Sequence, residues 1–132
     1  MFANTQSYAL NLGFPDVCKT LVALAVVPIP YPNMSFTSSA IPNIFNQFIT
    51  CMPVHNMMTT VPVSNGNEAG TLLGVVSQLI CGPTIHLLGS VKIFRSVMPA
   101  TKMLSVSGQN GMALNIPGST LSPSQVKVLY FS

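Results

Sequence analysis

The sequence predicts a mostly β fold of short strands, and two observations support this prediction. Eleven prolines and nine glycines recur along the 132 residues, which leaves little room for helices because proline removes a helical hydrogen bond and glycine favours turns. The apolar stretches between them are rich in β-branched and aromatic side chains, which favour strands. The length suits one hydrophobic core, so we expect a single domain over residues 1–132.

The first expected element is an extended segment over residues 26–32. Its sequence, Val-Val-Pro-Ile-Pro-Tyr-Pro, fixes φ at three prolines and biases the preceding residues toward extended backbone. Proline cannot donate to a central ladder, so the segment is predicted to be polyproline-like or an edge strand. The apolar run that leads into it, from Leu21 to Val27, is too short to cross a membrane, which takes about 20 residues.

Three further strands are expected at residues 44–50, 91–97 and 126–131, each bounded by turn formers. Asn-Gly pairs within 64–67 and 109–111 predict tight turns, because Asn and Gly tolerate positive φ. Residues 71–79 are expected to form either a short helix or a strand.

An internal repeat connects two of these strands. Residues 52–60 and 98–106 share Met, Pro and Met at the same positions, and each copy follows a strand candidate that contains Ile-Phe, at Ile44 and Ile93. Each copy also leads into an Asn-Gly turn. Repeated units of this kind usually surround a pseudo-symmetry axis, because one unit cannot bury its apolar face alone.

The charge content is low for a water-exposed surface. Apolar residues make up 48% of the chain and charged residues 5%, whereas soluble domains carry about 25% charged residues. We therefore expect a partner to cover part of the surface. The net charge of +3 comes from scattered groups, which does not predict nucleic-acid binding. The first residues lack a signal-peptide pattern, so we expect a cytoplasmic start.

Six motifs in order resemble the PAAR-like branch of the PAAR family. They are Met-Phe-Ala-Asn-Thr at 1–5, Phe-Pro-Asp-Val-Cys at 14–18, Pro-Ile-Pro-Tyr-Pro-Asn at 28–33, Met-Pro-Val-His-Asn at 52–56, Ser-Asn-Gly at 64–66 and Pro-Ser-Gln-Val-Lys-Val at 123–128. The family's name motif, Pro-Ala-Ala-Arg, corresponds to Pro-Val-His-Asn at 53–56 and Pro-Ala-Thr-Lys at 99–102. The resemblance covers nearly the whole chain.

This resemblance implies a compact cone with pseudo-threefold character, in which the third repeat must be degenerate. It also implies a non-enzymatic spike tip that caps the trimeric valine-glycine-repeat (VgrG-type) spike protein of a type VI secretion system, one tip per trimer. Carriage of toxin effectors, secretion through that system without a signal peptide, and transient contact with a target membrane follow from the same resemblance. The base of the cone is expected to contact the spike through the repeat corners: Met52, Pro53, Val54, Met98, Pro99 and Ala100.

The metal chemistry of the family cannot be transferred whole. PAAR domains hold zinc with three histidines and one cysteine, whereas this chain has two histidines in all and none in 61–70 or 107–111. One hypothesis is a mixed zinc site from Cys18, His55, Cys81 and His86, which are ligand types suited to zinc. The other is that these thiols are packed as apolar groups, with His55 structural. Three cysteines without C-x-x-C spacing argue against a disulfide framework.

The sequence leaves two alternative functions open. The first is an adaptor that delivers a separate toxin. The second is a small metal-dependent hydrolase, which the shortage of acid and base groups disfavours, since Asp16 and Glu68 are the only carboxylates. No catalytic residue is assigned.

Overall fold

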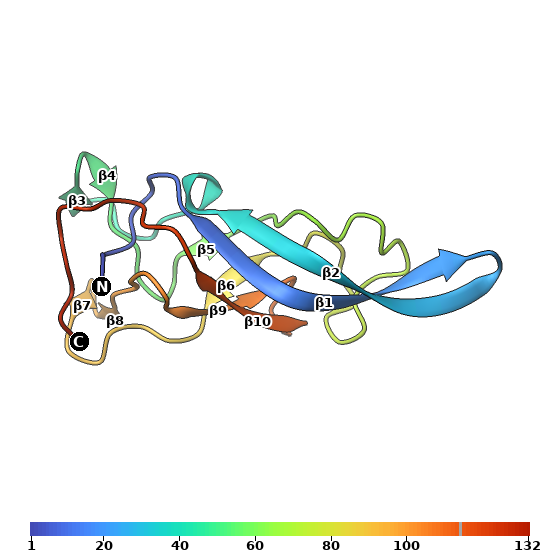
Figure 1. The fold of residues 1–132 in the computed structure, drawn as a ribbon. Coiled ribbons are helices and arrows are strands. Elements are labelled where there is room, and N and C mark those ends of the chain that lie inside the picture. Colours follow the sequence, from blue (N-terminus) through green and yellow to red (C-terminus); the bar gives the residue numbers. More distant parts are fainter. Residues whose placement is uncertain (114) are drawn as a thin grey trace.

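The computed structural model describes residues 1–113 and 115–132, and within them the fold is almost entirely β, as predicted. The strands in chain order are β1 (Leu10–Val22), β2 (Ala25–Phe36), β3 (Phe48–Ile49), β4 (Met52–Pro53), β5 (Thr60–Val61), β6 (Thr84–His86), β7 (Phe94–Arg95), β8 (Met98–Pro99), β9 (Val106–Gln109) and β10 (Ile116–Thr120), with one 3-10 turn at Thr37–Ser39. The molecule tapers from a broad end, which holds β3, β4, β7, β8 and both chain ends, to the β1–β2 hairpin (Figure 1). The taper agrees with the predicted cone.

The body is one antiparallel sheet of six strands in the order β2-β1-β10-β9-β6-β5. Its edge strand β2 contains the proline-rich segment, which confirms the prediction of an edge. Pro28, Pro30 and Pro32 occupy every second position of β2. Alternate N–H groups of an edge strand face away from its neighbour, so prolines at this spacing need not remove ladder bonds to β1.

Two small hairpins form the repeat corners at the broad end. In the first, Phe48 pairs with Pro53, and in the second, Phe94 pairs with Pro99. The strands expected at 44–50 and 91–97 are therefore only two residues long. The register also corrects the repeat, because the residue equivalent to Phe94 is Phe48 rather than Phe45.

Two other predicted elements differ from the structure. Residues 71–79 form turns and a single bridge, Cys18 with Gly74, and no helix or strand. This segment follows β1, where the Lys19 N–H donates to Leu73 O (2.9 Å) and the Val75 N–H to Val17 O (3.1 Å). The expected strand at 126–131 supplies one bridge, Leu129 with Phe2. The turns are confirmed by positive φ at Gly66 (113°) and Gly111 (120°).

The interior of the narrow half is polar rather than apolar. The buried carboxylate of Asp16 accepts hydrogen bonds from the side-chain amides of Asn33 (2.8 Å), Asn67 (2.8 Å) and Asn115. These three asparagines come from distant parts of the chain. The Asp16 carboxylate therefore joins β1, β2 and two loops. Its burial is tolerated because these amide donors satisfy its oxygens.

We expect Asp16→Ala to lower the free energy of unfolding by about 3 kcal/mol, because three buried amide donors lose a charged acceptor. The matched control is Glu68→Ala, which also removes one carboxylate but from an exposed hydrogen bond to the Gly66 N–H. It should cost less than about 1 kcal/mol. Urea unfolding followed by circular dichroism measures both values. Equal losses would show that the network does not stabilise the fold.

Candidate functional site

The broad end is built from three equivalent corners around a closed ring of backbone hydrogen bonds. The Asn4 N–H donates to Thr101 O (3.1 Å), the Thr101 N–H to His55 O (3.3 Å), and the His55 N–H to Asn4 O (3.0 Å). Each segment also bridges the next, through Thr5 with Val54, Asn56 with Ala100, and Lys102 with Ala3. We call residues 45–57 corner one, 91–103 corner two, and 126–132 with 1–6 corner three.

Outside the ring, the three corners also make equivalent backbone hydrogen bonds. Within the corners, the Val54 N–H donates to Gln47 O (3.1 Å), the Ala100 N–H to Ile93 O (2.9 Å), and the Ala3 N–H to Val128 O (3.0 Å). Between the corners, the N–H groups of Gln6, Met57 and Met103 donate to the carbonyls of Pro53, Pro99 and Phe2. The third repeat is thus Met-Phe-Ala-Asn-Thr at 1–5, and residues 129 and 130 take the place that β3 and β7 occupy in the other two corners. Its sequence is degenerate, as expected, since Phe2 stands in place of proline.

Equivalent positions in the three corners also share their exposure. Two positions present apolar side chains to solvent in every corner: Phe45, Val91 and Val126 at one, and Phe48, Phe94 and Leu129 at the other. In the second set the exposed fractions are 58%, 58% and 45%. Large apolar side chains so exposed around one axis indicate a contact surface. We call these six residues the docking triads.

The structure changes the predicted set of contact residues. Val54 and Ala100 are 1% and 0% exposed. Ala100 belongs to the core cluster with Ala3 and Tyr130. These two residues therefore cannot form the surface that sequence analysis assigned to them. Met52 is exposed, whereas Pro53, Met98 and Pro99 are partly buried. The docking triads were missed because their exposure depends on the hairpin register.

The broad end is also basic. Lys92 and Lys127 occupy equivalent exposed positions, with Asn46 as the third member. Beside the buried Tyr130, Arg95 donates to Tyr130 Oη (3.1 Å) and Gln47 Oε1 (3.2 Å). Its guanidinium lies 5.6 Å from the centre of the Tyr130 ring. The surface therefore combines apolar side chains with positive charge.

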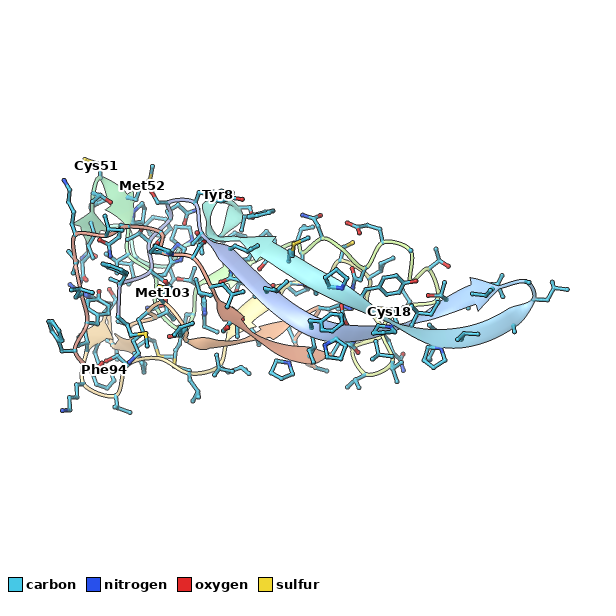
Figure 2. All side chains as sticks on the ribbon, in the orientation of Figure 1. Tyr8, Cys18, Cys51, Met52, Phe94 and Met103 are labelled. Carbon is cyan, nitrogen blue, oxygen red and sulfur yellow. The ribbon has the colours of Figure 1, made fainter. Side chains whose placement is uncertain are left out.

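The four residues proposed as zinc ligands do not form one site. Both thiols contact Asn67: Cys18 Sγ lies 3.7 Å from its Nδ2, and Cys81 Sγ lies 3.4 Å from its Oδ1. Burial raises the pKa of the Cys18 thiol to about 11, and the Asp16 carboxylate raises it further in the same direction. Burial also raises the pKa of Cys81. Within residues 1–113 and 115–132, no three His, Cys, Asp or Glu side chains are placed to hold a metal. The four candidate residues therefore do not fit a single zinc site. Figure 2 shows Cys18 along the narrow half, far from Phe94 and Met52.

The two histidines lie in the interior. His55 is fully buried, and its Nε2 contacts Gln6 Oε1 at 2.9 Å. His86 is 4% exposed, and among the described residues neither of its ring nitrogens has a hydrogen-bond partner. Burial lowers the pKa of His55 to about 3, helped by the charge of His86, and lowers the pKa of His86 to about 4. Both imidazoles are therefore neutral near pH 7 and fill space as weakly polar groups.

We expect the thermal midpoint of the purified protein to shift by less than about 1 °C on addition of EDTA or of equimolar zinc, because the candidate ligands are not gathered at one point. Differential scanning fluorimetry with an extrinsic dye, paired with elemental analysis of the sample, measures this. A fall of several degrees with EDTA, reversed by zinc, would contradict the expectation.

Comparison with known proteins identifies the family of this chain. The family model described as the toxin PAAR-like domain matches residues 9–118, which is most of the chain. No curated protein matches, and no solved structure matches. No helix in the described part of the chain has the length and apolarity to cross a membrane. The chain therefore belongs to the toxin PAAR-like domain family, which relates it in general terms to the spike and effectors of type VI secretion.

Proposed function

We propose that this protein is a structural tip that caps the end of a trimeric, VgrG-type spike. The observation that carries this proposal is the pseudo-threefold broad end. Three corners with the same hydrogen bonds present two apolar positions each at matching exposures. A surface of this symmetry can make the same contact with each chain of a trimer, so a single copy satisfies the whole end of the spike.

The chemistry of the broad end further defines the partner. Phe48, Phe94 and Leu129 require three apolar sockets, one on each spike chain. Lys92 and Lys127 are exposed beside them, so the matching end of the spike is expected to carry carboxylates at its rim. Such charges accelerate association and set orientation more than they add affinity. The role requires no turnover.

The experiment that tests this proposal is co-purification with a trimeric spike protein encoded beside this chain, followed by native mass determination. The expected complex contains three spike chains and one copy of this protein. A monomeric fragment of the same spike serves as control and should bind at least about tenfold more weakly, because it offers one socket instead of three. A folded trimer that fails to bind would overturn the proposal, as would three copies bound per trimer.

A further inference from the structure

The closed ring of the broad end carries a buried polar side chain at each of its three equivalent positions. Asn4, His55 and Thr101 are all 0% exposed. In residues 1–113 and 115–132, six buried side-chain nitrogen and oxygen atoms have no hydrogen-bond partner. Three of them are Asn4 Oδ1, His55 Nδ1 and Thr101 Oγ1, and two more are the ring nitrogens of His86. Buried polar groups are normally satisfied, so an orphaned atom at every position of the ring indicates a shared ligand.

His86 lies beside the same ring. The charge of its imidazole is one of the causes that lower the pKa of His55, so the two side chains are close enough to interact through the interior. The segment that follows His86 runs along corner two, where the Ser90 N–H donates to Ala100 O (2.7 Å). Ala100 directly precedes Thr101 in the ring. We call Asn4, His55, His86 and Thr101 the axial cluster.

Neighbouring hydrogen bonds fix the tautomer of His55. The side-chain amide of Gln6 donates through Nε2 to Ser38 O (3.1 Å) and Ala40 O (2.6 Å), so its Oε1 is the acceptor that faces His55 Nε2. His55 Nε2 must then carry the proton of the neutral imidazole. The orphaned Nδ1 is therefore a bare lone pair that can only accept.

The other members of the axial cluster supply one more acceptor and two donors. Asn4 donates through Nδ2 to Lys102 O (3.2 Å) and Thr120 Oγ1 (3.3 Å), which leaves its Oδ1 as an acceptor. The Thr101 hydroxyl and the neutral imidazole of His86 each carry one proton to donate. The axial cluster thus presents two unmatched acceptors and two unmatched donors.

We propose that the axial cluster binds one buried water molecule. A water molecule donates two hydrogen bonds and accepts two, which matches this set of groups. It donates to Asn4 Oδ1 and His55 Nδ1, and it accepts from the Thr101 hydroxyl and from a ring N–H of His86. Buried waters typically make about three such bonds. A cation matches less well, because it cannot accept from the two donors and the axial cluster holds no carboxylate to balance its charge.

The bound water connects parts of the chain that are distant in sequence. Asn4 comes from corner three, His55 from corner one, Thr101 from corner two, and His86 from β6 of the six-stranded sheet. The water therefore joins all three corners to the body of the molecule at one point. This role concerns the interior of the broad end and does not depend on the spike partner proposed above.

Thr101→Val tests the proposal through the sign of its effect, because valine keeps the shape of threonine and removes only the hydroxyl. If that hydroxyl donates to a bound water, its loss should lower the thermal midpoint by about 4 °C. A buried hydroxyl without any partner is itself destabilising, so an unchanged or raised midpoint would overturn the proposal. Thr71→Val makes the same change at an exposed position and should shift the midpoint by less than about 1 °C. Thermal unfolding followed by circular dichroism measures both variants.

A crystal structure of the native chain identifies the ligand. Water should give a density peak about 2.7–3.2 Å from Asn4 Oδ1, His55 Nδ1 and Thr101 Oγ1. A metal ion would lie about 2.0–2.2 Å from its ligands and scatter anomalously, and this result would overturn the proposal. Direct hydrogen bonds among the four side chains, with no peak between them, would also overturn it. Neither measurement contains a spike protein, so failure here is distinguishable from failure of the proposed function.

Discussion

Lowering the pH from 7 to 4 should destabilise this protein by about 6 kcal/mol, about 3 for each histidine. The folded-state pKa values of His55 and His86, about 3 and about 4, lie below the ordinary value of 6.5. Between pH 6.5 and 4 the unfolded chain therefore binds more protons than the folded chain, and stability falls as the pH falls. The loss is comparable with the whole stability of a typical domain, about 5–15 kcal/mol. Urea midpoints measured at half-unit steps of pH should show it.

Neutral replacements distinguish protonation of the two histidines from protonation of carboxylates as the cause of the lost stability. His86→Asn and His55→Gln remove the titrating groups, so each should flatten the pH dependence by roughly half, whatever it does to the stability at pH 7. The double variant should be nearly insensitive between pH 7 and 5. If the native chain and the double variant lose the same stability over this range, the histidines are not responsible.

Placing Asp at Phe48, Phe94 or Leu129 should weaken spike binding about 100-fold in each case. The substitution removes an apolar anchor and introduces a negative charge opposite a surface expected to be acidic, and an anchor of this kind is worth about 2–4 kcal/mol. All three side chains are exposed, so the variants should fold. Titration by surface plasmon resonance on an immobilised trimer measures the dissociation constants.

The comparison among the three variants tests the symmetry as well as the surface. A threefold partner makes equivalent contacts at each corner, so the three losses should be similar. Val63→Asp places the same charge on an exposed valine in the loop after β5 and should bind as the native chain does. A large loss confined to one corner would point to a partner without threefold symmetry, and no loss at any corner would remove the docking triads from the site.

Residue patterns were sufficient to predict the β class, the edge position of residues 26–32 and the glycine turns. Each of these depends on local backbone chemistry: proline lacks an N–H, and glycine accepts positive φ. The same local reasoning misplaced residues 71–79. Their valines are compatible with regular structure, but the segment instead forms turns bonded to β1.

The repeat shows where pattern comparison reached its limit. Two copies were visible because each carries Met-Pro within a continuous segment. The third is assembled from residues 1–6 and 126–132, so no window of the sequence contains it, and Phe2 removes the proline that marks the others. The predicted contacts at Val54 and Ala100 failed for a related reason, because strand register decides which neighbour faces the axis and which faces solvent.

By itself, the sequence determined the β class, the low charge, the family and the existence of repeated corners, since composition and local motifs carry that information. Only the tertiary structure decided that three corners close into a ring, that Phe48, Phe94 and Leu129 rather than Val54 and Ala100 face solvent, and that the candidate metal ligands do not converge. These properties depend on which distant segments share hydrogen bonds. Residues 1–5 become equivalent to 52–56 only when the chain has brought its two ends together.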